Sequence, residues 1–94
     1  SGVLHLASLL NNTGADIQFH TAVAADRGTG NVRMTIAGDG NVGIGTTSPA
    51  SKLQVNGGDI EVDDRDSGLI LRSPDGTRYR ITVANGGTLT VTAV

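Results

Sequence analysis

The 94-residue sequence has no cysteine and no tryptophan, and its only large aromatic side chains are Phe19 and Tyr79. The lack of cysteine excludes both a disulfide framework and a thiolate metal site. Aromatic side chains bury about 150–250 Å² each and dominate most cores, so this interior must be built from Val, Ile, Leu, Ala and Thr methyl groups. Domains of this size come out near zero stability even with good cores. The composition therefore predicts an obligate oligomer whose copies complete one another's core.

Strong charge of one sign and long apolar runs are also missing. Seven Lys and Arg against nine Asp and Glu give a net charge of −2, and the basic residues are scattered. This argues against a nucleic-acid partner. No apolar run approaches the 18 or so residues of a membrane span, so no membrane insertion is expected. The length fits one domain and leaves no room for a two-domain enzyme.

Apolar and polar residues alternate with period two along the whole chain, and no helical repeat persists for three turns. The sequence therefore predicts an all-β fold of short strands without a substantial helix, apart from one helical turn beginning at Pro49. We expect a single domain with N-terminal strands in residues 1–36, a glycine-rich section in 37–62 and a C-terminal β-meander in 63–94. The predicted strands run through residues 17–23, 31–36, 42–44, 53–55, 60–62, 69–72, 77–83 and 89–93.

Local turn chemistry supports this division. In residues 73–76, Pro followed by Asp-Gly fits a type I turn with the glycine in a left-handed bulge position, which predicts a hairpin between 69–72 and 77–83. Asp39-Gly40 and Asn85-Gly86-Gly87 predict further turns. The continuous apolar run Leu69-Ile70-Leu71 indicates burial on both faces.

Glycines alternate with Val42 and Ile44 in an unusual way. Gly43 and Gly45 leave one face of that strand without side chains, which favours the close approach of another backbone. We interpret these glycines, with Gly57 and Gly58, as the place where three chains converge. In a monomeric sandwich they would serve only turns and bulges.

Residues 34–57 carry a specific motif. Its centre is Asp39-Gly40-Asn41-Val42-Gly43-Ile44-Gly45-Thr46-Thr47-Ser48-Pro49, followed by Lys52-Leu53-Gln54-Val55. This stretch, about a quarter of the chain, resembles a segment of bacteriophage tail-fibre and related prophage proteins, and residues 14–19 and 73–79 also look like fibre sequence. Nothing resembles the Ser-Asp-x-Arg-Leu-Lys segment of the self-cleaving chaperone domain into which the family often continues.

The resemblance implies a homotrimer with two identical partner chains, interwoven as a triple-stranded β-helix or a β-prism-like fibre. It further implies an extracellular place in the virion tail fibre and a contribution to host attachment. The residues expected to pack the trimer are Val42, Gly43, Ile44, Gly45, Leu53, Val55, Ile60 and Val62.

The acidic residues raise the possibility of glycoside hydrolysis, which needs two suitably spaced carboxylates. The set is Asp59, Glu61, Asp63, Asp64 and Asp66. The first three alternate with Ile60 and Val62 as a solvated strand face would, and the chain can hardly enclose a shaped pocket. We therefore expect no catalytic residues and no enzyme. A polysaccharide-degrading tailspike fragment, dependent on Asp63 and Asp66, stays as an alternative.

Other candidate sites are weaker. Residues 64–68 resemble a calcium loop, but glycine falls fifth instead of sixth. His5 or His20 could meet symmetry mates on a threefold axis, although a solvated histidine is the simpler interpretation, and we expect neither metal nor cofactor. Arg72, Arg78 and Arg80 flank one hairpin and could bind a host cell-surface glycan or protein, or acidic residues of a neighbouring subunit. The alternative overall function is a monomeric β-sandwich module that binds a receptor or carbohydrate.

Overall fold

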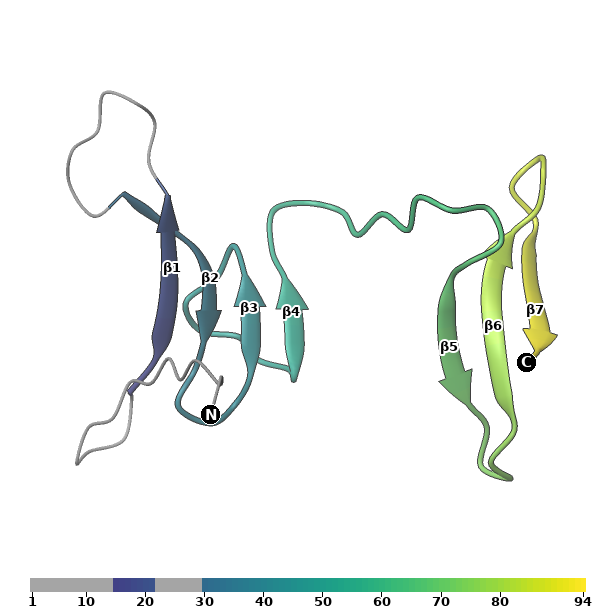
Figure 1. Cartoon of the computed structure of the whole chain (residues 1–94), viewed down its shortest axis with the longest axis horizontal. Coiled ribbons are helices and arrows are strands. Elements are labelled where there is room, and N and C mark those ends of the chain that lie inside the picture. Colours follow the sequence, from purple (N-terminus) through teal and green to yellow (C-terminus); the bar gives the residue numbers. More distant parts are fainter. Residues whose placement is uncertain (1–14, 22–29) are drawn as a thin grey trace, which may run out of the picture. The chain divides into compact units, whose positions relative to one another are not determined.

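The computed structural model describes residues 15–21 and 30–94. These residues form seven strands in two sheets and contain no helix (Figure 1), which confirms the predicted all-β class. Within them, no helix is long and apolar enough to cross a membrane. The chain divides into two units, Ser1–Asp59 and Ile60–Val94, and each holds one sheet. Ala22 and Val23, the last two residues of the expected strand at 17–23, lie outside the described residues.

The first sheet has the order β1-β2-β3-β4. Its strands are β1 (Ile17–Thr21), β2 (Asn31–Ile36), β3 (Val42–Ile44) and β4 (Leu53–Val55). β1–β2 and β2–β3 are antiparallel, with a register shift between Phe19 and His20, whereas β3–β4 is parallel. Because β3 and β4 are parallel, the loop between them returns the chain to the end of the sheet at which β3 begins.

The helical turn expected at Pro49 is wrong, because residues 45–52 form only bends. Side chains form hydrogen bonds with the backbone groups that would otherwise pair within a helical turn. The Ala50 amide donates to Gln54 Oε1 at 2.7 Å, and Asn41 Nδ2 donates to the Pro49 carbonyl at 3.3 Å. The Ser48 amide donates to Thr46 Oγ1 at 3.1 Å. These contacts tie the loop to strands β3 and β4.

The second sheet is an antiparallel meander of β5 (Leu69–Arg72), β6 (Arg78–Val83) and β7 (Leu89–Ala93). The expected β5–β6 hairpin is confirmed, and Arg72 pairs with Arg78 at its end. The Ser73 amide donates to the Thr77 carbonyl at 2.8 Å, and Gly76 has a φ of +91°. Only glycine adopts that conformation without strain, so the turn follows directly from the sequence.

The three hairpin turns share one hydrogen-bond pattern. In each, the first residue's amide donates to the fifth residue's carbonyl at 2.8 Å, and the fourth residue is a glycine with φ of +91°. The turns occupy residues 37–41, 73–77 and 84–88. Asp39 and Asp75 each add a carboxylate that accepts the amide two residues later, at 3.0 Å. The Asp-Gly signals therefore predicted both turns correctly.

Two expectations about strands fail. Residues 60–62 form no strand, and Ile60 and Val62 remain 68% and 46% exposed. Strand backbone groups need a paired neighbour, and the described chain supplies none for this segment. Burial of the 69–71 run on both faces is also wrong in the single chain, because Leu69, Ile70 and Leu71 are all exposed.

Candidate functional site

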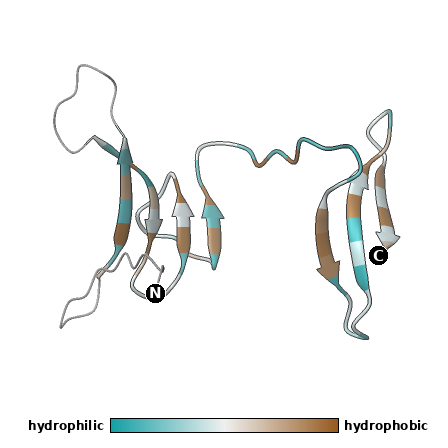
Figure 2. Cartoon of the chain, viewed as in Figure 1, coloured by the Kyte–Doolittle hydropathy of each residue, from teal (hydrophilic) through white to brown (hydrophobic). Residues whose placement is uncertain are grey.

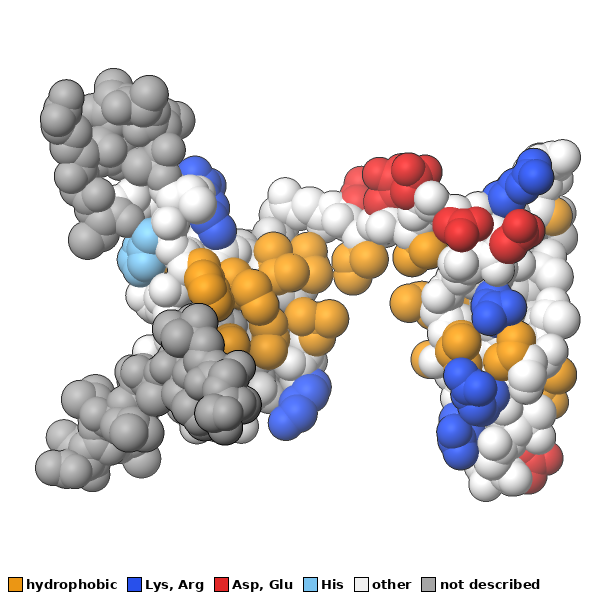
Figure 3. Space-filling view, viewed as in Figure 1, with side chains coloured by type: hydrophobic (Ala, Val, Ile, Leu, Met, Phe, Trp, Pro, Cys, Tyr) orange, Lys and Arg blue, Asp and Glu red, His pale blue; other side chains and the backbone are white. Residues whose placement is uncertain are grey.

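The first sheet carries its apolar residues on one face, which we call the first apolar face. Cross-strand partners share a face, and the register pairs Phe19 with Met34, Met34 with Ile44, and Ile44 with Val55. The complete set is Ile17, Phe19, Met34, Ile36, Val42, Ile44, Leu53 and Val55. Phe19 and Ile44 are 43% exposed and Leu53 is 58% exposed. Hydrophobic side chains gather over this sheet in Figure 3. Four of the residues expected to pack a trimer, Val42, Ile44, Leu53 and Val55, thus lie together.

The opposite face of the first sheet is the part that the chain covers itself. Thr35 pairs with Gly43 and is 0% exposed, and Pro49 is also buried. Because Gly43 has no side chain, the loop after β3 can lie directly on the sheet. A Cβ atom on Gly43 would come within 2.7 Å of the Thr46 carbonyl oxygen. The Thr35 hydroxyl has no hydrogen-bond partner among the described residues.

Gly45 is also enclosed within one chain. Its φ is +79°, and a Cβ atom there would overlap the Asn56 carbonyl oxygen. Asn56 in turn donates its amide to the Ile44 carbonyl at 2.9 Å and its side-chain nitrogen to the Gly45 carbonyl at 3.3 Å. The backbone that approaches this glycine face therefore belongs to the same chain. A role of Gly43 and Gly45 in packing a trimer stays a prediction.

The second sheet also separates its residues by face, and Figure 2 shows apolar and polar residues alternating along β6 and β7. Its register places Leu71 beside Tyr79, Leu69 beside Ile81, and Val83 beside Leu89. The full set, the second apolar face, is Leu69, Leu71, Tyr79, Ile81, Val83, Leu89, Val91 and Ala93. Val83 and Leu89 are each 64% exposed. Among the described residues of the whole chain, no hydrophobic side chain is buried.

The other side of the second sheet is the arginine face. Arg72 lies directly opposite Arg78, and Arg80 lies opposite Ile70. Thr82, Thr90 and Thr92 complete this face. The structure thus brings together the three arginines that the sequence marked as a possible binding surface. Like charges directly opposite each other in a sheet are destabilising, so this face favours an acidic neighbour.

Asp75 at the tip of the β5–β6 hairpin has a lowered pKa. The Ser73 hydroxyl donates to Asp75 Oδ1 at 2.6 Å, and the Thr77 amide donates to the same oxygen at 3.0 Å. These hydrogen bonds, with that from Ser73 the largest cause, lower the pKa of Asp75 from 3.8 to about 2. They favour the charged form because both donors bind the carboxylate. The Asp75 carboxylate therefore stabilises the turn through these two hydrogen bonds.

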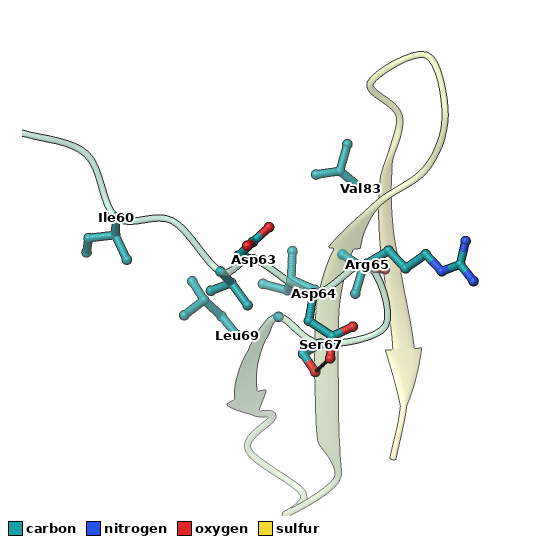
Figure 4. A pocket seen from close by; sticks show the side chains of 11 residues that line it. Ile60, Asp63, Asp64, Arg65, Ser67, Leu69 and Val83 are labelled. Atoms are coloured by element: carbon teal, nitrogen blue, oxygen red, sulfur yellow. Dashed lines mark hydrogen bonds between the residues drawn. The ribbon is translucent and has the colours of Figure 1, made fainter.

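A pocket of about 450 Å³ lies where residues 60–68 pass the second sheet (Figure 4). Its apolar lining is Ile60, Val62, Leu69, Ile81 and Val83, and its polar lining includes Asp63, Asp64, Arg65 and Ser67. The sequence did not predict this pocket. Figure 4 shows Ile60 and Leu69 on one side and the Arg65 side chain extended away from them. Ile60 and Val62 thus lie near the second apolar face, in the second unit, whereas the other expected trimer residues belong to the first unit.

The carboxylate of Asp64 is engaged within its own turn. Its Oδ1 accepts the Asp66 amide at 2.9 Å and its Oδ2 accepts the Ser67 hydroxyl at 3.2 Å. The following residue, Gly68, is a packing residue that sequence reasoning missed, because a Cβ atom there would overlap the Ile81 carbonyl oxygen. Its position between a polar turn and an apolar run was the only available signal. Residues 64–68, the candidate calcium loop, thus contain a hydrogen-bonded turn and lead the chain into β5.

Of the two histidines, only His20 lies among the described residues, and His5 falls outside them. His20 is exposed, and its Nε2 lies 3.2 Å from Gln18 Oε1 in a hydrogen bond. Across residues 15–21 and 30–94, no three His, Asp or Glu side chains are grouped as metal ligands would be.

Among the described residues, the chain therefore presents two exposed apolar faces, an arginine face and a segment at residues 60–63 that pairs with no strand. No protein-family model matches this chain, and no curated protein matches it either.

Proposed function

We propose that this chain is a structural segment of a bacteriophage tail fibre, in which three identical chains assemble through their apolar faces. It contributes to attachment of the virion to the host cell and carries out no reaction. The observation that carries the proposal is that no described hydrophobic side chain is buried, although sixteen of them lie on two open faces.

Physical chemistry favours covering these faces. Burial of apolar surface stabilises by about 25 cal/mol per Å², and contiguous exposed apolar patches on soluble proteins mark interaction sites. A chain that leaves Leu53, Leu69 and Leu89 between 58% and 64% exposed gains little of this energy alone. Further copies of the same chain would supply matching apolar faces.

The number of copies and the biological setting come from the resemblance of residues 34–57 to tail-fibre sequence. Within that motif, Val42, Ile44, Leu53 and Val55 supply half of the first apolar face. The arginine face is a candidate surface either for a host glycan or protein or for acidic residues of a neighbouring chain. The segment would thus have a mechanical role between virion and host.

A second candidate function is a monomeric β-sandwich module that binds a receptor or carbohydrate. One observation favours it, because each unit offers an apolar face of eight residues and two such faces could cover each other in one chain. The two candidate functions predict different masses in solution, that of three chains and that of one chain. The scarcity of aromatic side chains, with only Phe19 and Tyr79 present, weighs against carbohydrate binding, since aromatic rings are the usual apolar anchors of binding sites.

Sedimentation equilibrium at low micromolar concentration tests the proposal. We expect a mass three times the 9.5 kDa of one chain, with thermal stability that rises with concentration. A folded species of one chain mass, with concentration-independent unfolding, would establish the monomeric sandwich. A glycan array applied to the same sample tests the binding function separately.

A further inference from the structure

Residues 60–63 have the side-chain pattern of a strand but pair with no strand in the part of the chain that the structure describes. Ile60 and Val62 alternate with Glu61 and Asp63, and the segment runs as an unpaired connection before the turn at residues 64–67. Its two apolar side chains are 68% and 46% exposed. An extended segment of this kind becomes a stable strand when a sheet edge accepts its backbone hydrogen bonds.

The outer edge of β5 is suited to accept it. Among the strands that the structure describes, β5 pairs only with β6, and all four of its residues are exposed. Leu69, Ile70 and Leu71 provide none of the charges or prolines that usually protect an edge strand. The edge therefore presents unpaired backbone groups beside an apolar surface.

A chain cannot use its own segment for this purpose while the turn at residues 64–67 keeps its observed form. Asp64 and Arg65 line the same pocket as Thr82 and Val83 of β6. The chain therefore crosses the sheet beside Leu69, the first residue of β5, before that strand begins. Gly68 then lies directly against the Ile81 carbonyl. Residues 60–63 consequently run away from the β5 edge instead of along it.

We propose that residues 60–63 of one copy add as a strand to the outer edge of β5 in the next copy, an inference that rests on the proposed trimeric function. With Ile60 and Val62 on the second apolar face, Glu61 and Asp63 necessarily fall on the arginine face. Apolar residues then meet apolar residues, and acids meet arginines. Repeated from copy to copy, this head-to-tail contact closes into a ring of three.

Charge complementarity distinguishes the β5 edge from the other edge of this sheet. Arg72 is on β5 itself and faces Arg78 across the strand pair, whereas β7 contributes only Thr90 and Thr92 to this face. A carboxylate beside Arg72 relieves the repulsion within that like-charged pair. The arginine face is thereby an intersubunit surface for the acidic side of the segment.

Disulfide trapping tests the contact directly, because the chain has no cysteine of its own. Residues opposite each other on neighbouring strands have Cβ atoms about 4.5–5.5 Å apart, close to disulfide geometry. We expect Glu61→Cys combined with either Ile70→Cys or Arg72→Cys to give covalent multimers on a denaturing gel without reductant. The matched control, Glu61→Cys with Thr92→Cys, places the second cysteine on the same face at the far strand and should give none.

Charge exchange provides a second measurement that needs no cross-link. Glu61→Arg with Asp63→Arg, or Arg72→Glu with Arg78→Glu, should each raise the concentration at which the assembly dissociates by about ten-fold. Combining all four substitutions restores opposite signs, and we expect most of the loss to be recovered. Equal weakening without recovery would overturn the proposed pairing.

The outcomes separate this inference from the proposed function. A trimer that forms without cross-links at positions 70 or 72 would overturn the strand addition and leave the trimeric fibre segment standing. A monomeric parent chain would overturn both. A trimer unaffected by Arg72→Glu with Arg78→Glu, whose parent binds dextran sulfate through those arginines, would show that the arginine face serves an external anion instead.

Discussion

The two sheets differ in what the chain does with the side opposite each apolar face. In the first sheet, the loop after β3 covers that side, and Thr35, Gly43 and Pro49 are buried beneath or within it. In the second sheet, no residue is buried, and the arginine face is open. The first sheet is therefore partly stabilised by a loop of its own chain. The stability of the second sheet depends more on contacts with another molecule.

This difference shows where assembly energy must come from. In the first sheet, the loop after β3 lies against Gly43, and Asn56 after β4 lies against Gly45. These contacts cover the polar side of the sheet and leave its apolar side exposed. A three-stranded sheet needs an apolar face packed on something to be stable. Both sheets thus depend on burial of their apolar faces, and the second sheet has no local substitute.

The largest expected effect comes from a charge on the second apolar face. Val91→Asp should raise the concentration needed for assembly on the order of 100-fold, because an unpaired carboxylate would be buried in every interface. Val91 is 56% exposed in the single chain, so the substitution would be harmless there. Sedimentation over a dilution series measures the shift.

The matched control is Thr92→Asp, at the next residue of β7 on the arginine face. We expect assembly to be retained in that variant. Equal assembly of both variants would show that the second apolar face stays open and would contradict the proposed trimer.

A glycine substitution in each sheet gives the next largest effect. Gly45→Ala should lower the free energy of unfolding by about 3 kcal/mol for two reasons. The alanine would be held in a left-handed backbone conformation, and its Cβ atom would overlap the Asn56 carbonyl oxygen. Gly68→Ala should cost about 1–3 kcal/mol from the overlap with Ile81 alone. Gly58, where an added Cβ atom would meet nothing within 4 Å, is the control, and Gly58→Ala should change stability by less than about 0.5 kcal/mol. Urea unfolding measures all three.

Thr35→Val sharpens the comparison through a side chain found buried only in the first sheet. Removing the unpartnered hydroxyl should stabilise the chain by about 1 kcal/mol, since a buried polar group without a hydrogen bond is costly. Thr82→Val, at a half-buried position of the arginine face, should change the free energy of unfolding by less than about 0.5 kcal/mol. Thermal unfolding distinguishes them, and a destabilised Thr35→Val would mean that the hydroxyl has a partner.

Turns and strands were predictable from the sequence because both depend on neighbouring residues. Asp39-Gly40 and Asp75-Gly76 define their turns locally, and period-two alternation predicted strands β2 and β6. Partners were not predictable in this way. Alternation in residues 60–62 indicated a strand without showing that the chain offers it no neighbour, and the need for Gly68 arises from the distant Ile81 carbonyl. The prediction of a helical turn at Pro49 was wrong because the side chains of Gln54 and Asn41, which lie outside the loop, form hydrogen bonds with the loop backbone.

The smallest expected effect compares the turns at residues 37–41 and 73–77. Both contain an aspartate that accepts an amide, but only Asp75 also accepts a serine hydroxyl. Its pKa is lower in the folded chain, about 2 against 3.8, so the stabilisation it provides is complete above pH 3.8 and is lost as the pH falls towards 2. Ser73→Ala should move the pKa of Asp75 back towards 3.8 in an NMR titration, and Asp75→Asn should remove this part of the acid sensitivity. Because the carboxylate is fully exposed, the change should be confined to the β5–β6 hairpin, and an unchanged Asp75 titration in Ser73→Ala would mean that the Thr77 amide alone holds the charge.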